Sequence, residues 1–339
     1  MSNDAHLEHP SFQDIKMNVI KEKLQLDEVL EELKQGIEDL YESERYKNYL
    51  TVLSRFHSYS ANNCLLIAMQ KPDATYVAGY TAWKKNFGRQ VRKGEKAIKI
   101  LAPAPYKVRQ KREKIDLADG KPILKGDGTP VTEEYEVIVP AYKIANCFDI
   151  SQTEGRELPS LVHILNGSVE DYSLLFDALQ RVSPVPISFE NIESSTNGYY
   201  HLGKKHIVIR TGMGQQQNIK TLIHEISHAK LHDWNDDEGM DKLVDRGTAE
   251  VQAESVAYVV AQHYGIDTSE YSFGYIAGWS KSKQLDELRE SLQTIRSCSG
   301  ELIDQIDKVL LEIQSKTLEK KETVVQAITS AKVRRHRRH

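Results

Sequence analysis

The segment His224-Glu225-Ile226-Ser227-His228 constrains this chain of 339 residues more than any other feature. The surrounding residues predict a buried amphipathic helix, because apolar side chains recur at helical spacing. These are Ile219, Leu222, Ile223, Ile226, Ala229 and Leu231. Residues four apart share a helix face, so His224 and His228 can place two imidazole nitrogens on one metal ion. The alternative is that both histidines are ordinary residues of an amphipathic helix.

Glu225 follows the first histidine directly, where its carboxylate can lie beside the metal. There it can take a proton from the attacking water, which is the general-base role in zinc hydrolases. A catalytic zinc has three protein ligands and an open fourth position. The motif therefore predicts a Zn²⁺ cofactor, a catalytic Glu225 and one further ligand elsewhere in the chain.

Acidic candidates for that ligand occur in the next helical stretch, residues 248–260. Glu250 and Glu254 lie four apart on one face of an otherwise apolar helix. Burying two carboxylates is costly unless a cation or a hydrogen-bond donor receives them. Zinc would receive one, and a ligand histidine would donate to the other. His232 also competes as a ligand, but three consecutive helical turns converge poorly on one ion. We therefore expect His232 to be a partner of a ligand or to face solvent.

This arrangement resembles the gluzincins, in which HExxH is followed about two dozen residues later by Glu-x-x-Ala-acid. The resemblance implies that Glu250 is the third ligand and that Glu254 orients a ligand histidine. Many gluzincins have Asp where this chain has Glu254, which leaves the two roles exchangeable.

A second pattern lies in the first half of the chain. Tyr80, Trp83 and Phe87 have the spacing of one helix face, and cations are interleaved with them or follow: Lys84, Lys85, Arg89, Arg92, Lys93 and Lys96. Aromatic platforms among cations suit single-stranded nucleic acid, because bases stack on rings while Lys and Arg neutralise phosphates. The alternative is a core stripe beside a solvated basic face.

Three blocks in order resemble the ArdC and LtrC-like antirestriction proteins of conjugative mobile elements, over roughly residues 12 to 300. They are the Trp-Lys…Val-Arg-Lys-Gly-Glu-Lys segment from Trp83 to Lys96, the segment from Phe148 to Gly155, and HExxH with its second helix. The resemblance implies an N-terminal single-stranded-DNA-binding domain, a C-terminal zincin-like metallopeptidase domain and DNA protection during conjugative transfer. The alternative function is a zinc metallopeptidase that cleaves a specific regulatory protein, such as a repressor.

The predicted fold class is α+β with two domains: N-terminal helices with a β-hairpin or small sheet, then the zincin-like domain. We predict a disordered N-terminus (1–11), a DNA-binding domain (12–151), a linker (152–160), a metallopeptidase domain (161–316) and a helical or disordered basic tail (317–339). The expected helices are 12–33, 37–58, one through Trp83, 169–183, 284–297 and 302–315. The expected strands are 96–108, 135–148, 185–190, 198–202 and 206–210. We expect 96–108 to form a hairpin with 135–148, and 198–202 to form another with 206–210.

The family resemblance also places Ile207 to Arg210 as the edge strand that pairs with a bound peptide. The aromatic segment from Tyr271 to Trp279 is expected to wall the cleft. The net charge of −4 excludes a uniformly basic surface but permits a basic groove. Three dispersed cysteines indicate neither disulfides nor a cysteine metal site. Without a long apolar run we expect no membrane association and a cytoplasmic location.

Overall fold

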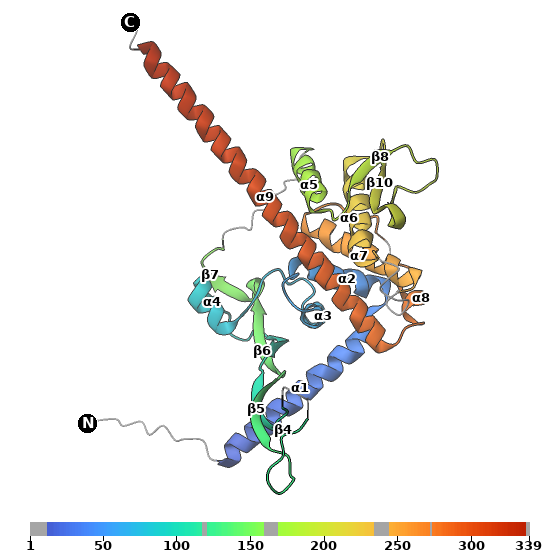
Figure 1. Ribbon diagram of the computed structural model, residues 1–339. Coiled ribbons are helices and arrows are strands. Elements are labelled where there is room, and N and C mark those ends of the chain that lie inside the picture. The colour runs from blue at the N-terminus through green and yellow to red at the C-terminus, as the bar shows by residue number, and fades with distance from the viewer. Residues whose placement is uncertain (1–11, 117–120, 159–168, 234–243, 272, 337–339) are drawn as a thin grey trace, which may run out of the picture. The chain divides into compact units, whose positions relative to one another are not determined.

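The computed structural model describes residues 12–116, 121–158, 169–233, 244–271 and 273–336. It contains helices together with small sheets, as the predicted fold class requires (Figure 1). Contacts divide the chain into two compact units. Unit 1 comprises Met1–Leu33 and Val77–Glu154, and unit 2 comprises Lys34–Tyr76 and Gly155–His339. The predicted N-terminal segment 1–11 and the end of the predicted linker, 159–160, lie outside the described residues.

Unit 1 is built mainly from short strands, which follow the first part of helix α1 (Phe12–Leu40). They are β1 (Val77–Gly79), β2 (Arg89–Val91), β3 (Ile98–Pro103), β4 (Tyr106–Glu113), β5 (Thr132–Val139), β6 (Tyr142–Asp149) and β7 (Thr153–Gly155), with α4 (Tyr80–Phe87) between β1 and β2. The sheets are β1-β6-β3, β2-β7 and β4-β5. The antiparallel β3-β6 and β4-β5 pairs confirm the predicted hairpin.

Prolines divide each predicted strand of that hairpin into two. The chain leaves the ladder after Pro103 and again at Pro140, so 96–108 becomes β3 and β4, and 135–148 becomes β5 and β6. Proline has no backbone N–H to give to a ladder, which explains both interruptions. Opposite charges face each other across the outer pair, as in Lys107 with Glu136 and Arg112 with Glu133.

Unit 2 carries the HExxH segment on a helix above a small sheet. Its helices are α2 (Ser43–Arg55), α3 (Ala61–Gln70), α5 (Val169–Val182), α6 (Gln215–Leu231), α7 (Arg246–His263), α8 (Ile276–Ser280) and α9 (Leu285–His336). Its strands are β8 (Ile187–Glu190), β9 (Gly198–His201) and β10 (His206–Arg210), in the order β8-β10-β9. The predicted hairpin of 198–202 with 206–210 is present as the antiparallel β9-β10 pair.

The expectation for the peptide-pairing strand is wrong in one respect. β10, which contains Ile207 to Arg210, is the central strand, paired in parallel with β8 and antiparallel with β9. Both of its edges are therefore occupied. The free edges of this described sheet belong to β8 and β9, so a peptide that adds a strand must do so at one of those two.

The packing separates the units after Glu154, inside the predicted linker, but it groups Lys34–Tyr76 with unit 2 and not with the predicted N-terminal domain 12–151. Helices α2 and α3 group with unit 2, because α2 lies against α7. The buried Tyr46 hydroxyl is 2.7 Å from Ser255 Oγ, and Thr51 Oγ1 is 2.8 Å from the Tyr258 hydroxyl. The N-terminal helices thus complete the core beneath the second helix of the candidate metal site.

Two predicted gaps between helices, at residues 34–36 and 298–301, are also wrong. Gly36 lies inside α1, where a Cβ would come 2.5 Å from Met69 Sδ, and Gly300 lies inside α9, where a Cβ would come 3.2 Å from the His57 carbonyl oxygen. Both glycines permit close helix packing instead of ending a helix. α9 is consequently continuous from Leu285 to His336 and includes the described part of the predicted basic tail. Among the described residues, no helix has the length and apolar composition needed to cross a membrane.

Candidate metal centre

Helices α6 and α7 bring together the two histidines and one of the two candidate glutamates. His224 Nε2 and His228 Nε2 lie 3.1 Å apart on consecutive turns of α6. Glu250 Oε2, from α7, is 3.6 Å from the first nitrogen and 3.7 Å from the second. Among the described residues, these three form the group of His, Cys and acidic side chains whose ligand atoms can hold one ion.

This triangle fits a tetrahedral zinc ion. Zinc binds imidazole nitrogen and carboxylate oxygen at about 2.0–2.2 Å, so neighbouring ligand atoms in a tetrahedral site lie about 3.3–3.6 Å apart. The three distances in the structure bracket that range. Two nitrogens and one oxygen are also the donor set of a catalytic zinc site. The residues present therefore fit the cofactor that the sequence predicts.

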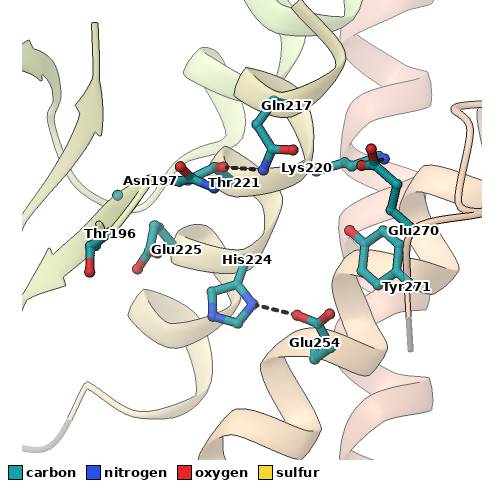
Figure 2. A pocket seen from close by; sticks show the side chains of 11 residues that line it. Thr196, Asn197, Gln217, Lys220, Thr221, His224, Glu225, Glu254, Glu270 and Tyr271 are labelled. Carbon is teal, nitrogen blue, oxygen red and sulfur yellow. Dashed lines mark hydrogen bonds and ion pairs between the residues drawn. The ribbon is translucent and has the colours of Figure 1, made fainter. Parts of the chain in front are cut away.

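Glu254 occupies a different place from Glu250. Its Oε2 is 3.3 Å from His224 Nδ1, the ring nitrogen that points away from the triangle (Figure 2). A carboxylate there accepts the Nδ1 proton and leaves Nε2 free to bind a metal. The geometry supports Glu250 as the third ligand and Glu254 as the partner of His224, which is the order implied by the gluzincin resemblance.

The electrostatics favour a positive charge at this point. Burial lowers the pKa of His224, but Glu250 and Glu254 outweigh it and raise that pKa to about 10. His224 and His228 hold the pKa of Glu250 well below its usual range. A proton or a metal cation can supply the charge, and a metal would displace the proton.

Glu225 is buried on the strand side of the same helix turn. Burial raises the pKa of its carboxyl, while His224, His228 and a hydrogen bond from the Tyr200 backbone oppose the rise. The hydrogen bond fixes the carboxylate against β9. A raised pKa suits a group that must accept a proton and then release it.

His232 lies outside the ligand triangle, as predicted. Its Nδ1 is 2.9 Å from His228 Nδ1, and its Nε2 is 3.0 Å from Gln252 Oε1 on α7. Burial is the largest cause that lowers the pKa of His232, to about 4. Sequence reasoning considered this histidine but missed Gln252, because a buried glutamine gives no signal of its partner.

Two cavities border the candidate metal ligands, and His224 and Glu225 line both. One, of about 430 Å³, is lined by Thr196, Gln217, Thr221, Glu270 and Tyr271 among others, with His224, Glu225 and Glu254 at its floor (Figure 2). The other, of about 590 Å³, includes Tyr199, Leu202, His228 and Glu250. Gly198 of β9 lines both. The position of Tyr271 agrees with the predicted aromatic wall. Gln217 and Thr221 lie one or two turns before His224, so helical spacing could have identified them.

The predicted aromatic platform of unit 1 is only partly exposed. Trp83 is 0% exposed, and its Nε1–H donates to the Phe148 carbonyl oxygen at 2.9 Å. Phe87 packs on its ring with centroids 5.2 Å apart. The prediction that bases stack on Trp83 is therefore wrong. The alternative, that this residue belongs to a core stripe, is correct for Trp83. Tyr80 is the exposed member, at 54%.

The candidate basic residues separate into two groups. Arg89 donates to Thr153 Oγ1 and to its carbonyl oxygen, and Arg92 pairs with Glu95 and donates to the Ser151 carbonyl oxygen. These two arginines join β2 to the segment around β7. The lysines are exposed: Lys84, Lys85, Lys93 and Lys96. They are the candidates that solvent, and hence a phosphate backbone, can reach.

Fold and site together define an α+β protein of two units that carries an HExxH cluster of potential metal ligands. Residues 18–148 match the family described as the N-terminal domain of anti-restriction factor ArdC. That segment is similar to this family, and the predicted resemblance to ArdC is confirmed.

An uncharacterized protein of Bacillus anthracis is 30% identical over 324 residues, which is 86% of this chain and 53% of the relative. The chain thus spans about half the length of that relative. The antirestriction protein ArdC from plasmid R388 is similar in its metal-free crystal structure, with a TM-score of 0.48, 18% identity, and 75% of this chain and 86% of that chain covered. Its Mn(II)-bound structure gives a TM-score of 0.43, 18% identity and coverage of 74% and 85%.

Proposed function

We propose that this protein is an antirestriction protein of the ArdC type that binds single-stranded DNA through unit 1 and hydrolyses peptide bonds at a zinc site in unit 2. The family match of residues 18–148 supports the first part. The observation that carries the second is the triangle of His224 Nε2, His228 Nε2 and Glu250 Oε2, with Glu225 beside it.

The chemistry follows from the residues around the triangle. A zinc ion would supply Lewis acidity, which polarises a carbonyl oxygen and makes water more acidic. Glu225, fixed by the Tyr200 backbone, would accept the proton of the attacking water and pass it to the leaving amine. Glu254 would hold His224 in the tautomer that exposes Nε2.

A peptide can pair with β9, which is a free edge of the described sheet and borders both cavities. Both cavities are lined by His224 and Glu225, so a peptide paired with β9 would lie next to the candidate metal ligands.

The test of the zinc site is elemental analysis of the full chain, with zinc and manganese measured separately. Wild type should bind one zinc per chain, and His224→Ala should bind much less. Equal zinc in both proteins contradicts the site.

The test of hydrolysis uses Glu225→Gln, which should keep its zinc and lose cleavage of a denatured protein substrate by at least a hundredfold. Glu290→Gln, an exposed change on α9, is the matched control and should cleave normally. Cleavage by Glu225→Gln at the wild-type rate contradicts the proposed base.

Single-strand binding is tested on the full chain with a labelled oligonucleotide. Affinity should fall steeply with salt, and a Lys84→Gln, Lys85→Gln double variant should weaken binding and reduce the salt slope. The control replaces Lys107 and Glu136 together by neutral residues, which leaves the net charge unchanged because the two side chains already form an ion pair.

The second candidate function is a metallopeptidase that cleaves a specific regulatory protein such as a repressor, and the cavities beside the candidate metal ligands give room for a peptide segment. Glu225→Gln separates the two in a restriction-protection assay. Full protection by this variant would assign antirestriction to DNA binding alone, whereas lost protection would make cleavage part of it.

A further inference from the structure

The second ligand histidine is held by a buried chain of hydrogen-bonded side chains. His228 Nδ1 is 2.9 Å from His232 Nδ1, His232 Nε2 is 3.0 Å from Gln252 Oε1, and Gln252 Nε2 is 3.4 Å from Ser291 Oγ on α9. His232, Gln252 and Ser291 are each at most 5% exposed. Water therefore has little access to replace these hydrogen bonds.

Hydrogen-bond accounting assigns the proton positions along the chain. The Gln252 amide oxygen can only accept, so His232 Nε2 must carry the hydrogen. A neutral imidazole has one N–H, which leaves His232 Nδ1 as an acceptor. The hydrogen between the two rings then belongs to His228 Nδ1, and the free lone pair of His228 lies on Nε2, the atom in the ligand triangle.

We propose that His232, oriented by Gln252, is a positioning residue that fixes His228 in the metal-binding tautomer; this rests on the proposed metal site. His232 acts through His228 and does not touch the ion. The Gln252 amide sets the direction of the whole chain, because a reversed amide would donate to His232 Nε2 and place the hydrogen on the wrong nitrogen.

The two ligand histidines thus have partners of different charge. His224 is held by the Glu254 carboxylate, whereas His228 is held by a second imidazole ring, that of His232. Glu225, Glu250 and Glu254 would place three carboxylates around a bound divalent ion. An imidazole partner orients His228 without adding a fourth carboxylate.

The experiment measures zinc affinity of the full chain by competition with a chromophoric chelator. His232→Leu should bind zinc 10–100-fold more weakly, the usual effect of losing a partner of a ligand histidine. His232→Asn should restore most of this loss, because its side-chain oxygen can accept near the former Nδ1 position. Gln252→Glu should bind within about threefold of wild type, because a carboxylate also accepts from His232 Nε2.

The Co(II) form gives a second readout. A loosened His228 should change the visible absorption spectrum in His232→Leu and leave it close to wild type in His232→Asn. A general loss of packing would not be repaired by Asn, which is smaller than His.

A measurement on wild type keeps the proposal testable even where a variant does not fold. Nitrogen-15 NMR of histidine-labelled, zinc-loaded protein at neutral pH should show His232 protonated at Nε2 alone. Protonation at Nδ1, or wild-type zinc affinity and spectrum in a folded His232→Leu, would overturn the proposal while leaving the metal site intact. Failure of wild type to bind stoichiometric zinc would instead remove the metal site itself, and this inference with it.

Discussion

Replacing Trp83 by alanine separates a core role from a DNA-stacking role more sharply than any other substitution in unit 1. Trp83 is fully buried, its ring packs on Phe87, and its indole N–H donates to the Phe148 carbonyl oxygen. Truncating a buried tryptophan costs about 3–5 kcal/mol through lost burial and the cavity that remains. The lost hydrogen bond adds about 1 kcal/mol.

The sum, about 4–6 kcal/mol, is comparable with the whole stability of a domain, which is about 5–15 kcal/mol. We therefore expect Trp83→Ala to unfold much of unit 1 and to lose DNA binding for that reason. Tyr80→Ala is the matched control, because Tyr80 lies on the same helix but is exposed. It should change stability by only about 0.5 kcal/mol.

Hydrogen exchange with mass spectrometry on the full chain, over residues 77–154, is the appropriate assay, supported by urea unfolding followed by circular dichroism. Trp83→Ala should exchange rapidly there, and Tyr80→Ala should retain wild-type protection. Tyr80→Ala should still bind single-stranded DNA more weakly, by about 1–3 kcal/mol if a base stacks on its ring. A Trp83→Ala protein with native protection and lost DNA binding would refute the reasoning and restore Trp83 as a platform.

Three further outcomes are expected. Glu250→Gln should bind zinc far more weakly than Glu254→Gln, which should lose only about 10–100-fold; the reverse order, measured by chelator competition, would exchange their roles. The pKa of metal-free His224 is raised to about 10, so a proton competes with zinc for this residue below that pH. Zinc affinity should therefore rise roughly tenfold per pH unit between pH 6 and 8. A zinc affinity that does not change with pH would exclude His224 as a ligand. Gly198→Ala should lower stability by about 1–3 kcal/mol in thermal unfolding, because its Cβ would lie 2.9 Å from the Val208 carbonyl oxygen. Gly203→Ala has room for a Cβ and should leave stability unchanged. Equal melting temperatures of the two variants would show that β9 can shift to accommodate the added Cβ.

Local periodicity predicted the candidate site well. The helices that carry His224, Glu225, His228, Glu250 and Glu254 follow from apolar spacing, and the same spacing places each pair on one face. It could not show which glutamate meets the ring nitrogens of the triangle. That depends on how far α7 is displaced along α6, which is set by packing between the helices.

The same limit explains the errors in the fold. The gaps expected at residues 34–36 and 298–301 are spanned by α1 and α9, and the glycine in each, Gly36 and Gly300, lies where a neighbouring segment comes close. The strand of Ile207 to Arg210 was recognised, but its neighbours were not, because strand order is not a local property.

By itself the sequence determined the chemistry available to this protein: two histidines and two carboxylates at metal-ligand spacing, a third carboxylate beside them, and an ArdC-like N-terminal segment. Tertiary structure decided what covers each face. It buried Trp83, joined α2 and α3 to unit 2, made β9 an edge, and placed Gln252 behind His232. The physical reason is that backbone periodicity fixes the direction of a side chain, whereas contacts between residues far apart in the chain fix what it meets.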